Sequence, residues 1–143
     1  MTGDQHTLTV EVLTPEGEVF EGEVAQVSTR TATGEIGILA NHVPILAALE
    51  PTELRLHVSD SEVQRYAQAH GWLQVFANHA LLLVEEAIPP DELDTGKLQE
   101  QISDAEQRLG EADEGSAAFD RAEKDRSRAE AFLAVAEGGS QQG

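Results

Sequence analysis

Apolar and polar residues alternate along the first part of the chain, up to about residue 88. Leu8, Val10 and Val12 follow this period of two, and the same period returns at Leu54 and Leu56. Such alternation is typical of β-strands with one buried face. Strands are expected over residues 8–13, 19–20, 24–29, 36–39, 45–49, 53–58, 63–68, 71–76 and 80–84. Because short strands with frequent turns characterise antiparallel sandwiches and barrels, the pattern predicts an antiparallel β-sandwich.

Turn residues mark the expected ends of these strands. Thr14-Pro15-Glu16-Gly17 and residues 59–62 carry the proline, glycine, serine and aspartate typical of tight turns. Glu21-Gly22 is expected to separate the second strand from the third, and Asn78-His79 is expected to form the turn between the last two strands.

The period changes after Pro89-Pro90. Apolar residues then recur at helical spacing from Leu93 to Leu109, and Gly110 is expected to end this first helix. A second helix is expected from about Ala117 to about Ala136, with Ser116 as its N-cap. The predicted organisation is a β-sandwich domain over residues 1–88, a helical hairpin over 89–137 and a disordered tail over 138–143.

The apolar face of the second helix is thin, because most of its expected inward residues are alanines. These residues are Ala118, Ala122, Ala129, Phe132, Leu133 and Ala136. Alanine buries little apolar area and contributes far less than leucine at ~25 cal/mol per Å². We therefore expect a hairpin that is weakly held and able to open, and a permanently docked hairpin is the alternative.

Composition and charge narrow the function. The chain has 143 residues, 40% of them hydrophobic, which suits one domain with a small appendage. It contains no cysteine, which excludes disulfides and thiolate metal sites, and it shows no secretory signal pattern. A net charge of −18 disfavours binding to nucleic acid or to an anionic membrane surface. Lys97 and Lys124 are its lysines, a scarcity that fits either a solvated acidic surface or adaptation to salt.

Candidate chemistry is sparse. The five histidines lack metal-ligand spacing, and no phosphate-binding loop or nucleophile motif is present. Glu85-Glu86 could form an acid/base pair, but adjacent strand residues point to opposite faces, which favours solvated charges. We expect no catalytic residue and no metal site.

One segment, residues 34–46, mixes turn residues with an apolar run. Gly34 and Gly37 allow a turn or bulge, and Pro44 cannot donate to a sheet. Glu35 and His42 are expected on or beside the turn, where polar side chains face solvent or a partner. His42 could be a proton donor or a ligand, but a lone imidazole favours a hydrogen-bonding role at a surface or interface.

Several motifs occur in the order of a known family. They are Phe20-Glu21-Gly22-Glu23-Val24, Gly34-Glu35-Ile36-Gly37-Ile38-Leu39, His42-Val43-Pro44-Ile45-Leu46, Gly71-Trp72-Leu73-Gln74-Val75 and Arg128-Ala129-Glu130. Through them, residues 8–137 resemble the epsilon subunit of the bacterial F-type ATP synthase. His70 stands where the family's Gly-Gly pair has its first glycine.

The resemblance implies a ten-strand sandwich followed by an antiparallel helical hairpin. It also implies a non-catalytic rotor subunit on the central stalk, bound to the gamma subunit and the c ring, at the cytoplasmic face of the bacterial plasma membrane. The hairpin would extend transiently toward the alpha/beta head and block ATP hydrolysis. A free-standing acidic protein-binding module with a helical arm is the alternative function.

The resemblance also suggests site residues. Glu35 and His42 match family positions near the polar loops of the c ring, although the glycines and proline around them could merely shape a corner of the sandwich. Some members bind ATP through Ile/Leu-Asp-x-x-Arg-Ala, which matches Leu93-Asp94-Thr95-Gly96-Lys97-Leu98 here. Asp94, Lys97 and Arg128 are then the candidate ATP-binding residues. Lysine lacks the arginine fork, and Asp104 replaces another family arginine, so we expect weak or no ATP binding.

Overall fold

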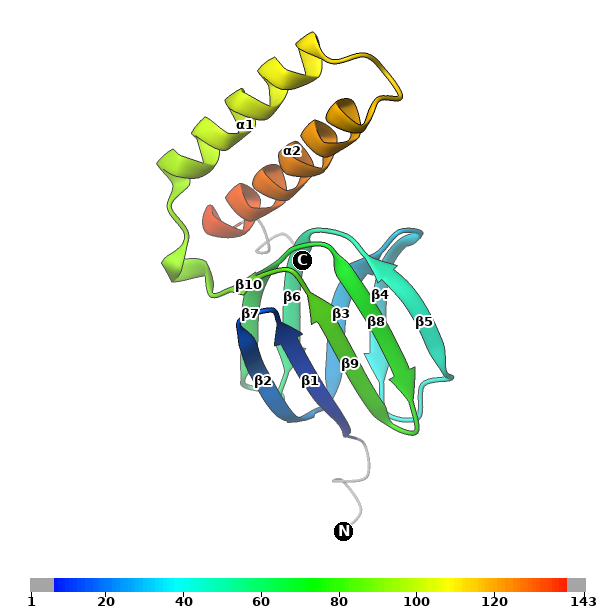
Figure 1. Ribbon diagram of the computed structural model, residues 1–143. Coiled ribbons are helices and arrows are strands. Elements are labelled where there is room, and N and C mark those ends of the chain that lie inside the picture. The colour runs from blue at the N-terminus through cyan, green and yellow to red at the C-terminus, as the bar shows by residue number, and fades with distance from the viewer. Residues whose placement is uncertain (1–6, 139–143) are drawn as a thin grey trace.

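The computed structural model describes residues 7–138, and most of the expected tail, residues 139–143, lies outside this range. Figure 1 shows a strand-rich N-terminal part and two long helices packed at one end of it. The strands are β1 (Leu8–Thr14), β2 (Gly17–Val24), β3 (Gln26–Thr31), β4 (Gly34–Leu39), β5 (Ile45–Leu49), β6 (Thr52–His57), β7 (Val63–Gln68), β8 (Gly71–Phe76), β9 (His79–Val84) and β10 (Ala87–Ile88). A short 3₁₀ turn, η2 (Pro90–Glu92), leads to the helices α1 (Thr95–Glu111) and α2 (Ala117–Ala136).

The strands form two layers of a sandwich. Their order is β10-β7-β6-β3-β5-β8-β9-β1-β2, with β4 paired to β3 outside this path. β3 and β5 meet through the single pair Thr31 and Leu49, so the sheet folds over at that point. One layer therefore contains β10, β7, β6, β3 and β4, and the other contains β5, β8, β9, β1 and β2. The predicted sandwich is confirmed.

One pairing departs from the expected antiparallel pattern. β1 runs parallel to β9, with Thr9 to Leu13 aligned with His79 to Leu83, and the two strands lie side by side in Figure 1. β1 also forms an antiparallel hairpin with β2. β1 thus lies between β2, its hairpin partner, and β9. The β1–β9 pairing joins strands far apart in sequence, so no local pattern predicts it.

Two local expectations were wrong. β2 runs without a break through Glu21-Gly22, because both residues pair with β1 across an edge of the sheet, where a glycine is tolerated. The turn between β8 and β9 falls at Ala77-Asn78 and not at Asn78-His79. Ala77 and Asn78 have φ of 53° and 62°, and two positive φ values are what a two-residue hairpin of matching twist requires.

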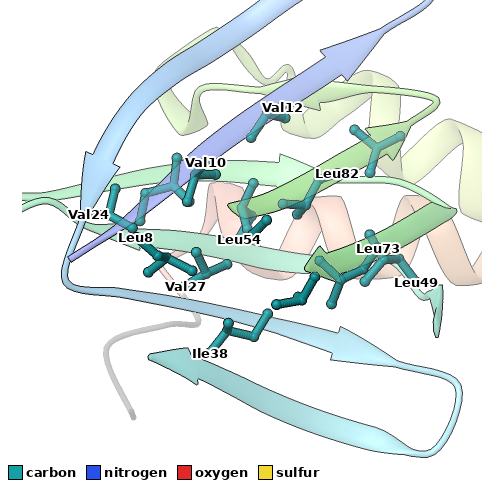
Figure 2. Close-up of a cluster of buried hydrophobic side chains, with 14 of the residues drawn as sticks. Leu8, Val10, Val12, Val24, Val27, Ile38, Leu49, Leu54, Leu73 and Leu82 are labelled. Atoms are coloured by element: carbon teal, nitrogen blue, oxygen red, sulfur yellow. The ribbon is translucent and has the colours of Figure 1, made fainter. Parts of the chain in front are cut away.

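The core lies between the two layers, and Figure 2 shows its aliphatic side chains converging from both of them. Leu8, Val10 and Val12 are fully buried, as their alternation predicted. Leu54 of β6 faces them (Figure 2), and Leu56 of the same strand is also fully buried. The buried members of this core are almost all aliphatic, and Tyr66 is the one aromatic residue among them.

The two helices begin at side-chain caps. The Asp94 carboxylate accepts a hydrogen bond from the Lys97 N–H at 3.1 Å, and the Ser116 hydroxyl accepts one from the Phe119 N–H at 3.1 Å. The predicted range and cap of α2 are confirmed. The expected stop at Gly110 was wrong, since α1 continues to Glu111 and the chain becomes extended at Ala112. Nothing lies within 4 Å of the position that a Gly110 side chain would occupy, so the glycine is accommodated inside the helix.

The hairpin packs on β6 and β7 through α2. A second apolar cluster joins Leu98 of α1, three residues of α2 and two alanines of the sandwich; its members are Ala67, Ala69, Leu98, Ala129, Phe132 and Val135. Phe132 and Ala129 are buried as expected. Ala118 is exposed, against expectation, and Val135 is buried while Ala136 and Leu133 are only half-buried. The face of α2 that reaches the sandwich is thus rotated slightly from the predicted one. Among residues 7–138, no helix is long and apolar enough to cross a membrane.

Candidate functional site

The segment 34–46 forms β4 and the loop that follows it. Glu35 is exposed and pairs in register with Arg30 of β3. Gly34, with φ of 133°, closes the β3–β4 turn, and this turn lines an open pocket together with Ser127 and Glu130 of α2. Glu35 therefore lies at the hairpin end of the sandwich.

His42 lies at the other end of β4. Its N–H donates to the Leu39 carbonyl at 3.2 Å, and its ring Nδ1 is 2.8 Å from the Val43 carbonyl oxygen. The structure thus does not bring Glu35 and His42 together. The length of β4, at ~3.3 Å per residue, separates them.

Asn78, which its sequence context predicted only as a turn residue, holds the His42 loop in place. Its carboxamide oxygen accepts a hydrogen bond from the Asn41 N–H at 2.8 Å. Its amide nitrogen donates to the Thr7 carbonyl, also at 2.8 Å. One side chain thereby joins the β4–β5 loop, the β8–β9 turn and the start of β1. We name residues 41–43 with Asn78 the distal end; Val43, which is 67% exposed, is its apolar member.

An apolar surface covers the outside of the layer that carries β5, β8 and β9. Its exposed members are Leu46 (71% exposed), Trp72 (56%), Phe76 (62%) and Leu83 (46%). Trp72 lies opposite Ala48 of β5 and Leu83 of β9, so the side chains adjoin across three strands. We name these four residues the outer face. The hairpin packs on β6 and β7 of the other layer, which leaves the outer face exposed. The chain is short of aromatics, at 4% of its residues, and two of them on one exposed face are the signal that could have identified it.

The candidate nucleotide residues are only partly brought together. Lys97 and Arg128 line one open pocket between the helices, with Arg108 and Gln101. Four carboxylates share that pocket, from Glu86, Glu100, Asp104 and Asp125. Asp94 is not among its lining residues, because its carboxylate caps α1. Four acidic side chains beside three basic ones make a poor environment for a polyphosphate.

The two arginines of this pocket are engaged by protein groups. Arg128 donates to both carboxylate oxygens of Glu86, from Nε at 2.5 Å and from Nη2 at 3.0 Å. Arg108 bonds Asp104 at 2.9 Å and Asp125 at 2.8 Å. The hydrogen bonds that Arg108 donates to Asp125 and Asp104 raise the pKa of Arg108 above its usual value. A nucleotide would have to displace these carboxylates to use either guanidinium.

His70 lies where the sandwich meets α2. Its Nε2 is 3.6 Å from a carboxylate oxygen of Glu50, and both residues line a pocket with Lys124 of α2. Burial lowers the pKa of His70, and the nearby Lys124 lowers it further, against the opposite influence of Glu50 and Glu85. Among residues 7–138, no three histidine or acidic side chains gather as a metal-binding group.

Comparisons with known proteins identify the family. The model of the ATP synthase delta/epsilon chain β-sandwich domain matches residues 7–90. An ATP synthase epsilon chain of Sulfurihydrogenibium is 37% identical over 89% of this chain and 95% of its own length. That of Halalkalibacterium halodurans is 38% identical over 91% of this chain and 97% of its own length.

Solved structures share the fold. A chain of the mitochondrial ATP synthase of Euglena gracilis, from a structure containing OSCP, F1 and the c-ring, superposes with a TM-score of 0.78 at 23% identity. The match covers 90% of the present chain and 81% of that one. The level of identity to the epsilon chains, over nearly their whole length, shows that this chain belongs to the ATP synthase epsilon chain family.

Proposed function

We propose that the chain is the central-stalk rotor subunit of an F-type ATP synthase, where it couples proton flow to ATP synthesis. The observation that carries this proposal is family membership over both the sandwich and the hairpin. The subunit itself would be non-catalytic, and the assembled complex would be the enzyme. Its place would be the cytoplasmic face of the bacterial plasma membrane, held there through the complex and not by a segment of its own.

The outer face supports the gamma subunit as a partner. Exposed Trp72 and Phe76 on a rigid sheet are the kind of aromatic anchors that protein interfaces bury. Trp72 is also the one tryptophan of the chain, so its fluorescence reports directly on this face. We expect a blue shift when purified gamma subunit is added.

The matched test replaces Phe76 by glutamine and, as a control, Val63 by glutamine. Val63 is exposed as well, at 41%, but lies on β7 in the other layer. Phe76→Gln should weaken gamma binding at least about tenfold, and Val63→Gln should leave it unchanged. Equal effects of the two variants, or no blue shift, would contradict this assignment.

We propose contact with the c ring through the distal end, with His42 as the leading residue. Glu35 can share that contact only if β4 lies along the ring, because the two residues occupy opposite ends of the strand. The absence of native cysteine allows single-cysteine variants at each position. Crosslinking to c subunits from His42→Cys but not from Glu35→Cys would assign the contact to the distal end. Crosslinking from Glu35→Cys alone would instead assign the c-ring contact to the β3–β4 turn.

The hairpin is proposed to regulate ATP hydrolysis by extending toward the alpha/beta head. Deletion of the residues after Asp91 should then raise hydrolysis by the assembled complex, and unchanged hydrolysis under all conditions would refute an inhibitory hairpin. ATP binding to the folded hairpin is proposed to be weak or absent. The carboxylates around Arg108 and Arg128 support this proposal, and isothermal titration that gave micromolar affinity would overturn it.

The alternative is a free-standing acidic protein-binding module with a helical arm. Co-purification separates the two functions. A rotor subunit is recovered with gamma and c subunits from detergent-solubilised membranes, whereas a free module remains in a stable pool outside the complex.

A further inference from the structure

We propose that the ion pair between Glu86 and Arg128 holds the hairpin against the sandwich, and that ionic strength sets how often the hairpin opens. The regulatory meaning of this device rests on the proposed function. The device itself belongs to the isolated chain and is tested there, so its failure and the failure of the proposed function can be distinguished.

Arg128 is bound on every side of its guanidinium. Glu86 accepts from Nε at 2.5 Å and from Nη2 at 3.0 Å, which makes a two-pronged pair. The Gln101 carboxamide oxygen accepts from Nη1 at 3.1 Å. The guanidinium carbon lies 4.4 Å from the centre of the Phe132 ring. Bidentate pairing and stacking fix the orientation of the group, so this pair is stronger than an ordinary surface ion pair.

The Glu86–Arg128 pair lies where it connects the hairpin to the sandwich. Glu86 lies in the segment between β9 and β10, Gln101 in α1 and Arg128 in the second half of α2. The side chain of Arg128 therefore joins the sandwich to both helices. Its partner Glu86 lies 42 residues earlier in the sequence. The ion pairs of Arg108, by contrast, stay within the hairpin and bind no residue of the sandwich.

The apolar contact between hairpin and sandwich is small enough for one ion pair to matter. The sandwich supplies Ala67 and Ala69 to the shared cluster, with half-buried Ile88 packed against it, and α2 adds Ala129 beside Phe132 and Val135. Alanines bury little area, so Phe132 carries much of the apolar contact. Arg128 stacks on that same ring, which couples the polar and apolar parts of the junction.

Salt should weaken this pair selectively. The side chains of Arg128 and Glu86 retain 24% and 38% of their exposure, so dissolved ions reach them. The screening length falls from about 10 Å at 0.1 M to about 3 Å at 1 M ionic strength. Apolar burial is not weakened by chloride salts in this way. Hairpin opening should therefore increase with salt through the loss of this pair.

Hydrogen exchange measured on the full isolated chain tests the proposal. Glu86→Gln and Arg128→Gln should each speed exchange in α2 by about 3- to 10-fold at low salt. The exchange of β1 and β9 should not change, which shows that the sandwich stays folded. Matched controls are Glu21→Gln, exposed on the edge strand β2, and Arg121→Gln, exposed on α2. Both controls should exchange as the unmodified chain does.

Two further measurements decide between a coupled pair and independent charges. The double variant Glu86→Gln/Arg128→Gln should exchange no faster than the quicker single variant, because each change removes the same interaction. Exchange of α2 in the unmodified chain should rise with NaCl, and that of Glu86→Gln should be nearly independent of NaCl. Multiplying effects in the double variant, or equal salt dependence of the two chains, would overturn the proposal.

Discussion

Gly71, at the start of β8, lies where two strands approach too closely for any side chain. A Cβ atom at this position would collide with the backbone of β9, at the Leu83 carbonyl oxygen and the Val84 Cα. These are backbone atoms of the β8–β9 ladder, and Gly71 itself pairs with both Leu49 and Val84. The neighbours therefore cannot move aside without disturbing two strand pairings.

We expect Gly71→Ala to lower the free energy of unfolding by about 1–3 kcal/mol, the usual cost of forcing extra atoms into a packed site. Urea denaturation measures the change. Gly110→Ala is the control, because that glycine lies inside α1 with nothing within 4 Å of its side-chain position. Alanine favours a helix interior, so this control should gain up to about 1 kcal/mol. A Gly71→Ala variant as stable as the unmodified chain would contradict so close an approach of β8 and β9.

His70, the neighbour of Gly71, should make stability fall in mild acid. Burial and Lys124 lower the pKa of His70 in the folded chain, below the value of about 6.5 expected when the chain is unfolded. At pH values above the pKa of His70 in the unfolded chain, the ring is neutral in both states. The folded state then has its full stability with respect to this group. This contribution is lost as the pH falls through that value toward the folded pKa.

The measurement compares the urea midpoints of the unmodified chain and of His70→Gln between about pH 8 and pH 5, a range that spans the ordinary histidine pKa. The variant should lose less stability on acidification, because its side chain does not titrate. Titration of the His70 ring by NMR provides the direct check. A midpoint at or above the value of free histidine would contradict the assigned direction.

At the scale of elements, caps explain why α2 begins where the sequence predicted. The Ser116 hydroxyl accepts from the Phe119 N–H, and it also donates to the Asp113 carbonyl at 2.6 Å. The cap thus closes both the loop and the first turn of the helix. No comparable signal marks the end of α1, where Gly110 suggested a stop but the backbone remained helical for one more residue.

We expect Ser116→Ala to reduce the stability of the hairpin by about 1 kcal/mol, the usual cost of removing an N-cap. Ser103→Ala is the control, since Ser103 is an exposed residue in the middle of α1, and it should be neutral or slightly stabilising. Hydrogen exchange in the first turn of α2 measures the difference. Equal exchange in the two variants would show that the cap does not limit the start of the helix.

Local patterns predicted the elements better than their pairing. Alternation located the strands of the core, since Leu8, Val10 and Val12 had to face one side of a sheet. The parallel pairing of β1 with β9 was missed because it depends on strands far apart in sequence. Ala118 was assigned inward by spacing alone, and packing on β6 and β7 turned a different face of α2 toward the sandwich.

The candidate site was foreseen in its residue types but not in its geometry. His42 and Glu35 were expected on or beside a turn, and an intervening strand separates them. Asn78 was expected only as a turn residue, because its contact with the His42 loop depends on a positive φ and on a residue 37 positions away. Arg128 was a candidate residue for a weak or absent nucleotide site, and its partner in the structure is Glu86, a carboxylate that the sequence pattern had placed in solvent.

At the scale of the whole molecule, the net charge of −18 is the main electrostatic feature. Acidic side chains outnumber basic ones by 27 to 9, so the compact chain repels itself. Screening of that repulsion by salt should stabilise the sandwich, whereas screening of the Glu86–Arg128 pair should loosen the hairpin. The two parts of the molecule are thus expected to respond to salt in opposite directions.

We therefore expect the melting temperature of the sandwich to rise by about 4 °C or more between 0.05 and 0.5 M NaCl, which corresponds to roughly 1 kcal/mol in a domain of this size. The fluorescence of Trp72, on β8 of the sandwich, measures the rise, and KCl should act as NaCl does because screening depends only on ionic strength. A plateau below about 0.5 M fits an ordinary acidic surface, since the screening length is by then only a few ångströms. A continued rise into molar salt fits adaptation to a saline environment. A melting temperature that falls with salt would show that attractive pairs, and not the net charge, control the stability of the sandwich.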